Sequence, residues 1–133
     1  QGYQPRGIII HGFSLGSGVA TYLAREAPAR ALILEAPFTG VDDVAAAHFT
    51  PLARLLIRDS YRSRDWIGNV NMPVLIVHGD ADTVIPFAQG QRLFELAREP
   101  KQFVRMRGSD HATLVRDGIY PQIWDFLAEH PPE

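Results

Sequence analysis

One continuous stretch near the start of the chain indicates its fold: Gly7-Ile8-Ile9-Ile10-His11-Gly12-Phe13-Ser14-Leu15-Gly16-Ser17-Gly18. The apolar run Gly7 to Ile10 predicts a β-strand, and Ser17 to Glu26 carries apolar residues at helical spacing. The pattern G-x-S-x-G, centred on Ser14, lies between them. In such a turn from strand to helix the serine backbone is strained, and the two flanking glycines let strand and helix approach closely. The stretch therefore predicts a serine hydroxyl presented above the edge of a sheet.

The rest of the chain repeats this alternation of strand and helix. Apolar runs at Ala31 to Glu35, Val74 to His78 and Phe103 to Arg107 predict three more strands. The earlier runs are almost continuously apolar, as strands of a parallel sheet covered on both faces must be. Helical spacing recurs in Phe87 to Arg98 and Pro121 to Glu129. We expect an α/β fold with a mostly parallel sheet of about four strands and flanking helices.

An insertion of residues 38 to 72 separates the second predicted strand from the third. It is too long for an ordinary loop, and Val41 to Phe49 and Leu52 to Tyr61 predict two short helices within it. Phe38 and Phe49 of the insertion, with Phe13 beside the serine, are candidates for an apolar substrate pocket. The alternative is that the insertion only completes the core.

Composition excludes several classes of protein. The chain has 133 residues, 46% of them hydrophobic, a net charge of −2 and no cysteine. Such a chain supports a single domain, residues 1–133, with no basic surface for nucleic acid and no thiolate chemistry. No apolar run approaches the length of a membrane helix, and the given residues do not begin with the charged and apolar regions of a signal peptide. The stretch Gly12 to Gly18 lacks the lysine of a P-loop and the third glycine of a dinucleotide fingerprint. No pair of histidine and carboxylate residues has the spacing typical of metal ligands.

An activated serine needs a base, and the base needs a carboxylate that orients it. His111 is the best candidate for the base because it directly follows the fourth predicted strand. Asp80 and Asp82 both follow the third strand. Asp80 is suited to the turn, and Asp82 is the better candidate for the orienting acid. The backbone N–H of Leu15, at the start of the helix, is the expected donor to an oxyanion.

These residues resemble the serine α/β-hydrolase superfamily, and within it the Bem46-like group. The resemblance lies in the serine turn, in Leu34-Glu35-Ala36-Pro37-Phe38-Thr39 and in His78-Gly79-Asp80-Ala81-Asp82-Thr83-Val84-Ile85-Pro86. It implies Ser14 as nucleophile, Asp82 as acid and His111 as base, in the chain order typical of that fold, with residues 38–72 as a helical cap. The family's sheet has further strands before the nucleophile strand, and a loop there supplies a second oxyanion donor. The resemblance thus implies a partial α/β-hydrolase fold that lacks its N-terminal strands and is impaired as a hydrolase.

The expected function is hydrolysis of an ester, thioester or amide of a small-molecule acyl substrate through an acyl-enzyme, with no cofactor and no metal. A serine peptidase or lactonase, or a non-catalytic hydrolase-like domain that binds a ligand or partner, are the alternatives. We also expect self-association through an unpaired edge at Gly7 to Ile10. The expected location is cytoplasmic, or membrane-associated if an N-terminal part carries an anchor.

Overall fold

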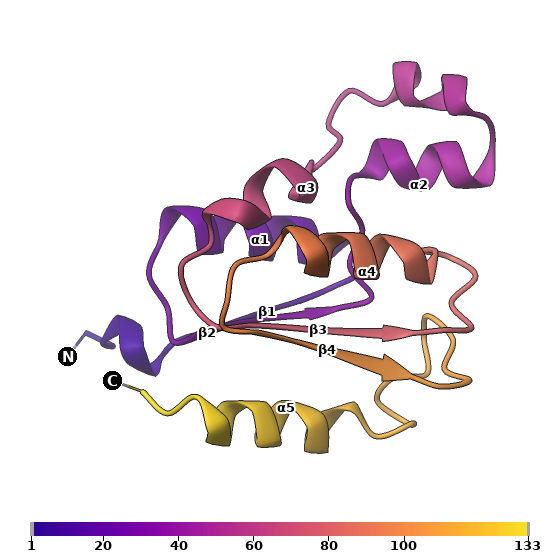
Figure 1. Cartoon of the computed structure of the whole chain (residues 1–133). Helices are drawn as coiled ribbons and strands as arrows, with labels where there is room; N and C mark the ends of the chain where they lie inside the picture. Colours follow the sequence, from indigo (N-terminus) through magenta and orange to yellow (C-terminus); the bar gives the residue numbers. More distant parts are fainter. Residues whose placement is uncertain (1, 133) are drawn as a thin grey trace.

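A four-stranded parallel sheet with helices on both faces forms the framework of the molecule (Figure 1). The computed structural model describes residues 2–132. Its elements, with 3-10 helices marked η, are η1 (Pro5–Gly7), β1 (Ile9–Phe13), α1 (Leu15–Glu26), β2 (Ala31–Glu35), α2 (Val41–His48), η2 (Pro51–Leu56), α3 (Ser63–Trp66), η3 (Ile67–Asn69), β3 (Val74–Gly79), α4 (Phe87–Leu96), β4 (Lys101–Met106) and α5 (Ile119–Glu129).

The strands lie in the order β1-β2-β3-β4, which confirms the α/β fold class predicted from the apolar runs. Every residue of β2 and β3 is buried, because helices cover both faces of these two strands. The helices α1, α3 and α4 lie on one face, and α5 lies on the other (Figure 1). Since all four strands run parallel, their carboxyl ends meet at one edge of the sheet, where the connecting loops gather.

The first strand begins later than the sequence predicts. Residues Pro5–Gly7 form a 3-10 turn, so the strand is Ile9–Phe13 rather than Gly7 to Ile10. Its last residue, Phe13, pairs with Glu35 at the end of β2. The shift carries the strand up to Ser14 itself, so that no loop residue separates β1 from the serine.

Helix α1 buries its small residues rather than its large apolar ones. Ala20 and Ala24 are buried, whereas Val19 and Leu23 are about half exposed, at 53% and 48%. The apolar spacing therefore predicted the helix correctly, but the large apolar residues at that spacing are not the ones it buries. The physical reason is the close approach of α1 to β1, which leaves room only for small side chains between them.

At the end of the insertion Ile67, Val70 and Met72 are buried in the core, whereas α2 and η2 form an arm that stands off the sheet (Figure 1). Its first helix, α2, matches the prediction to within one residue, but the predicted helix Leu52 to Tyr61 is wrong: only Pro51–Leu56 is helical, as a 3-10 turn. A short helix needs a core on which to bury its apolar face, and Leu52, Leu55 and Leu56 of this segment are 71 to 85% exposed.

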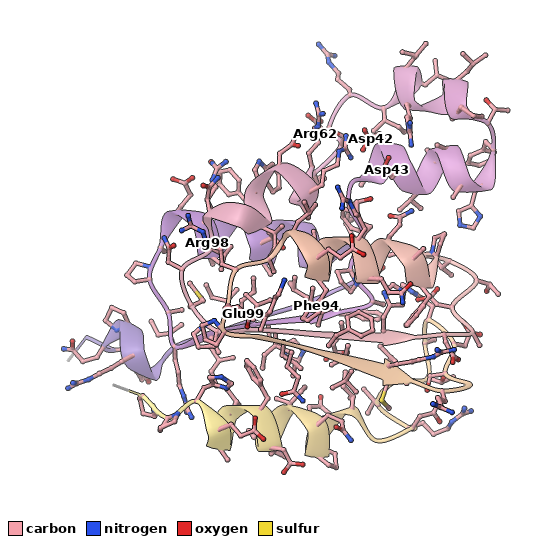
Figure 2. All side chains as sticks on the ribbon, in the orientation of Figure 1. Asp42, Asp43, Arg62, Phe94, Arg98 and Glu99 are labelled. Atoms are coloured by element: carbon pink, nitrogen blue, oxygen red, sulfur yellow. The ribbon has the colours of Figure 1, made fainter. Side chains whose placement is uncertain are left out.

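Ion pairs fix the base of the arm. Asp42 and Asp43 lie at the beginning of α2, where Figure 2 labels them, and Arg64 of α3 donates to both carboxylates at 2.7 to 2.9 Å. The Arg64 guanidinium lowers the pKa of Asp42. The arm is thus tied to the body of the molecule at α3.

Strand β1 pairs with one neighbour, β2, within residues 2–132. Its other edge carries backbone groups without a strand partner in this part of the chain. Self-association through that edge stays a prediction, with Ile9–Phe13 in place of Gly7 to Ile10 as the pairing segment.

Candidate active site

Ser14 lies at the tight turn between β1 and α1. Its backbone has φ 53° and ψ −120°, a conformation that non-glycine residues rarely adopt. The turn is held from both sides: Ser14 N–H donates to the Glu35 carbonyl at 3.0 Å, and the Ser14 carbonyl accepts from the backbone N–H and the hydroxyl of Ser17. These hydrogen bonds thus hold the strained backbone of Ser14 in place, and the serine lies at the edge of the sheet where the strands have their carboxyl ends.

Gly12 and Gly16, which flank the serine, have different roles. A Cβ at Gly12 would lie 2.5 Å from the Gly16 carbonyl oxygen and 2.6 Å from Ala20 Cβ, whereas a Cβ at Gly16 would meet nothing within 4 Å. The expectation that both glycines allow the close approach of strand and helix is therefore right for Gly12 and wrong for Gly16. Gly16 lies on the exposed side of α1.

His111 lies in the loop after β4, as predicted, and several contacts fix this loop. The buried Ser109 hydroxyl donates to Asp117 at 2.7 Å, and the Ser109 carbonyl accepts from Ala81 N–H of the loop after β3 at 3.1 Å. Hydrogen bonds from Arg116 and Ser109 lower the pKa of Asp117, so that this acceptor stays ionised. The histidine loop is thus attached to the neighbouring loop that carries the two aspartates.

Asp82 closes the turn in which it lies and also faces His111. Its Oδ1 accepts from the backbone N–H groups of Val84 and Ile85, both at 2.8 Å, and its Oδ2 lies 2.8 Å from His111 Nδ1. The Asp82 side chain is fully buried. Two backbone donors and one imidazole thus fix the orientation of this carboxylate.

The structure brings Ser14, His111 and Asp82 into one line of hydrogen bonds. His111 Nε2 lies 2.9 Å from Ser14 Oγ, while Nδ1 of the same ring contacts Asp82. An ionised carboxylate only accepts, so Nδ1 carries the proton in this arrangement and Nε2 is free to accept one from the serine. The Phe13 ring lies 5.1 Å from the imidazole, centroid to centroid, and covers one side of it.

The Asp80 carboxylate bonds residues at the end of β4 and in the loop after it, not the backbone of its own turn. Its carboxylate accepts from Gly108 N–H at 2.7 Å and from Arg105 Nε at 2.8 Å, and both contacts lower its pKa. The role expected of it, bonding within its own turn, is performed by Asp82 instead. Asp80 has no contact with His111 among the hydrogen bonds of the described residues.

The other four histidines have partners of their own, and His130 Nδ1 donates to the Phe126 carbonyl at 2.9 Å. His78 Nε2 donates to the Ile85 carbonyl, and His48 Nε2 donates to the Val84 carbonyl. Both carbonyls belong to the turn that carries Asp82. His11 contacts the buried carboxylate of Glu35, a pair that the sequence analysis did not predict. A signal was present, because an acidic residue in the otherwise apolar strand Ala31–Glu35 needs a partner when it is buried.

The three phenylalanines proposed for a substrate pocket lie in three different environments. Phe13 is 45% exposed beside His111, Phe38 is buried in the core at 2%, and Phe49 is 80% exposed on the arm. Phe38 therefore completes the core, packed near Gly18 of α1. A cavity of about 650 Å³ opens between α2 and η2. Its walls are almost entirely apolar and include Phe49, Leu52, Leu55 and Leu56.

Among residues 2–132, no group of three or more histidine and acidic side chains is placed to hold a metal ion. In the same part of the chain, no helix has both the length and the apolar character needed to cross a membrane.

With this geometry in place, comparison with known proteins gives the family. Residues 6–112 match the family model described as "Serine hydrolase (FSH1)", and the chain belongs to this family of serine hydrolases with the α/β-hydrolase fold. The finer Bem46-like grouping stays a prediction.

Individual relatives agree with the family. The chain is 41% identical over 109 residues to an uncharacterised protein of Mycobacterium tuberculosis, covering 80% of this chain and 38% of the relative. It is 35% identical over 158 residues to the lysophosphatidylserine lipase ABHD12 of Danio rerio, covering 96% of this chain and 41% of the relative. The chain thus spans about two-fifths of the length of these relatives. The acylaminoacyl peptidase of Pyrococcus horikoshii shares the fold, with a TM-score of 0.77 at 15% identity over 98% of this chain and 25% of that one.

The two glycines offer a matched test of the serine turn. We expect Gly12→Ala to lower the free energy of unfolding by about 1–3 kcal/mol, because its methyl group would overlap the backbone of α1. Gly16→Ala, which adds a methyl group in open space, should leave stability nearly unchanged. Urea denaturation of both variants would measure the difference, and equal losses would contradict the assigned roles.

Proposed function

We propose that this protein hydrolyses an ester, thioester or amide through an acyl-enzyme, with Ser14 as nucleophile, His111 as base and Asp82 as the orienting acid. The observation that carries the proposal is the line of hydrogen bonds from Ser14 Oγ through the His111 ring to Asp82. Membership of a serine hydrolase family supports the same reaction class.

The reaction begins with attack of Ser14 Oγ on the carbonyl carbon of the substrate. As the new C–O bond forms, the serine proton passes to His111 Nε2, and Asp82 stabilises the resulting imidazolium. The imidazolium then gives this proton to the leaving oxygen, sulfur or nitrogen, and the bond to the leaving group breaks. A water molecule attacks the acyl-enzyme in the same way, with His111 again as base, and releases the acid and the free serine.

Leu15 is the proposed backbone donor to the oxyanion. It is the first residue of α1, so its N–H has no acceptor within the helix, and the positive end of the helix dipole lies at the same place. Negative charge that develops on the carbonyl oxygen next to Ser14 is stabilised there.

For the substrate we propose an apolar acyl group. The supporting feature is the cavity between α2 and η2, whose walls are apolar. The arm that carries it reaches the acid turn, because His48 of α2 donates to the Val84 carbonyl at 2.5 Å. The lipase name of the Danio rerio relative agrees with an acyl substrate.

Covalent labelling tests the nucleophile. A fluorophosphonate probe should modify Ser14, because attack of an activated serine on phosphorus releases fluoride, and peptide mapping by mass spectrometry would locate the bond. Ser14→Ala should abolish labelling and lower kcat by about a millionfold. Modification of a different serine, or undiminished labelling of the alanine variant, would overturn the assignment of Ser14, whereas no labelling of the native protein would favour a non-catalytic binding domain.

The two aspartates provide a matched test of the acid. Asp82→Asn should lower kcat by roughly four orders of magnitude, because the amide no longer fixes the His111 tautomer or stabilises the imidazolium. Asp80→Asn should keep most of the activity, since Asp80 contacts Gly108 and Arg105 rather than the imidazole. Ester turnover by both purified variants measures this difference, and similar losses would mean that the acid is assigned wrongly.

Chain-length preference tests the acyl cavity. Phe49→Ala removes an exposed ring from the cavity wall and should change the ratio of kcat/KM for long and short acyl esters, by about tenfold for an interaction of 1.4 kcal/mol. Val115→Ala, at an exposed apolar residue outside the cavity, is the control. An unchanged ratio for Phe49→Ala would show that the arm does not contact the acyl chain.

A further inference from the structure

His78 is a fully buried histidine that the proposed mechanism does not use. It lies in β3, four residues before Asp82, and its side chain has no exposed surface. Its Nε2 donates to the Ile85 carbonyl at 2.9 Å, and the same nitrogen lies 3.3 Å from Asp82 Oδ2. One N–H group thus faces both the carboxylate and the turn that carries it.

The protonation of the His78 ring follows from its surroundings. A carbonyl oxygen only accepts, so Nε2 carries the proton, and burial lowers the pKa of His78, which keeps the ring neutral. Among residues 2–132, Nδ1 has no hydrogen-bond partner. The ring is therefore a neutral donor directed at the acid turn, and the buried lone pair on Nδ1 costs free energy that a purely apolar side chain would avoid.

Helix α4 packs against the His78 ring and restricts its orientation. A Cβ at Gly90 would lie 2.3 Å from His78 Nδ1, so only glycine leaves space for the imidazole there. The Phe87 ring contacts the same imidazole edge-on at a centroid distance of 5.7 Å. The orientation of the Nε2–H group is thus set by packing rather than by the hydrogen bond alone.

We infer that His78 is a positioning residue for Asp82, which holds the carboxylate and its turn so that Oδ2 stays directed at His111. Ile85 connects the two residues, because its N–H donates to Asp82 Oδ1 at 2.8 Å and its carbonyl accepts from His78. The inference rests on the proposed function, in which Asp82 orients the base. A misplacement of about 1 Å in such a group costs about a hundredfold in rate.

The test compares His78→Gln with His78→Met. The glutamine amide places an N–H donor near the position of Nε2, whereas methionine fills similar space without a donor. We expect the methionine variant to lose about a hundredfold in kcat with KM nearly unchanged, and the glutamine variant to recover most of that loss. A residue that only fills the core would give similar kcat values for both variants at similar melting temperatures, and that result would overturn the inference.

A second variant perturbs the ring without removing it. Gly90→Ala should lower kcat, although alanine favours a helix, because its methyl group displaces the imidazole. Gly68→Ala is the matched control, since a Cβ there would have its nearest neighbour, the Leu96 carbonyl oxygen, at 3.8 Å. Equal kcat values for the two alanine variants would contradict a role for the His78 orientation.

A spectroscopic readout separates this inference from the proposed function. The proton that His111 Nδ1 donates to Asp82 gives its own resonance in the NMR spectrum of the protein, independent of turnover. This resonance should persist in His78→Gln and shift or disappear in His78→Met. If the native protein neither turns over esters nor reacts with the fluorophosphonate, the proposed function fails, while an identical His111 resonance in both His78 variants would refute the positioning role by itself.

Discussion

The close approach of α1 to β1 at Gly12 is the constraint on which the site depends. With no side chain at this position, the helix begins close to the strand, and Ser14 in the turn between them has a strained backbone with φ 53° and ψ −120°. The same approach limits the buried face of α1 to residues as small as Ala20 and Ala24. A strained serine, a helix N-terminus beside it and a close-packed core thus have one physical origin.

Parallel pairing then determines which residues meet the serine. The loops after β3 and β4 emerge at the same edge as the serine turn, and the bonds from Ala81 to Ser109 and from Asp80 to Gly108 join these two loops. Asp82 and His111 are therefore carried by a single cross-linked unit. Their orientation depends on backbone hydrogen bonds within this unit as much as on the contact between their side chains.

The arm follows a different principle. It is anchored by ion pairs at Arg64 and by the contact of His48 with the acid turn, and its apolar residues face a cavity of their own instead of the sheet.

The sequence by itself determined the fold class and the strand Ala31–Glu35, and it predicted that Ser14, Asp82 and His111 lie together, because apolar periodicity and turn motifs are local signals. The catalytic roles of these three residues stay a prediction. Tertiary structure decided where the first strand begins, which face of α1 is buried, that Leu52 to Tyr61 is not one helix, and that Phe38 belongs to the core. It also decided the contacts of His11 with Glu35 and of His78 with Asp82. These outcomes depend on which surfaces meet across the sheet, and residue spacing along the chain carries no record of that.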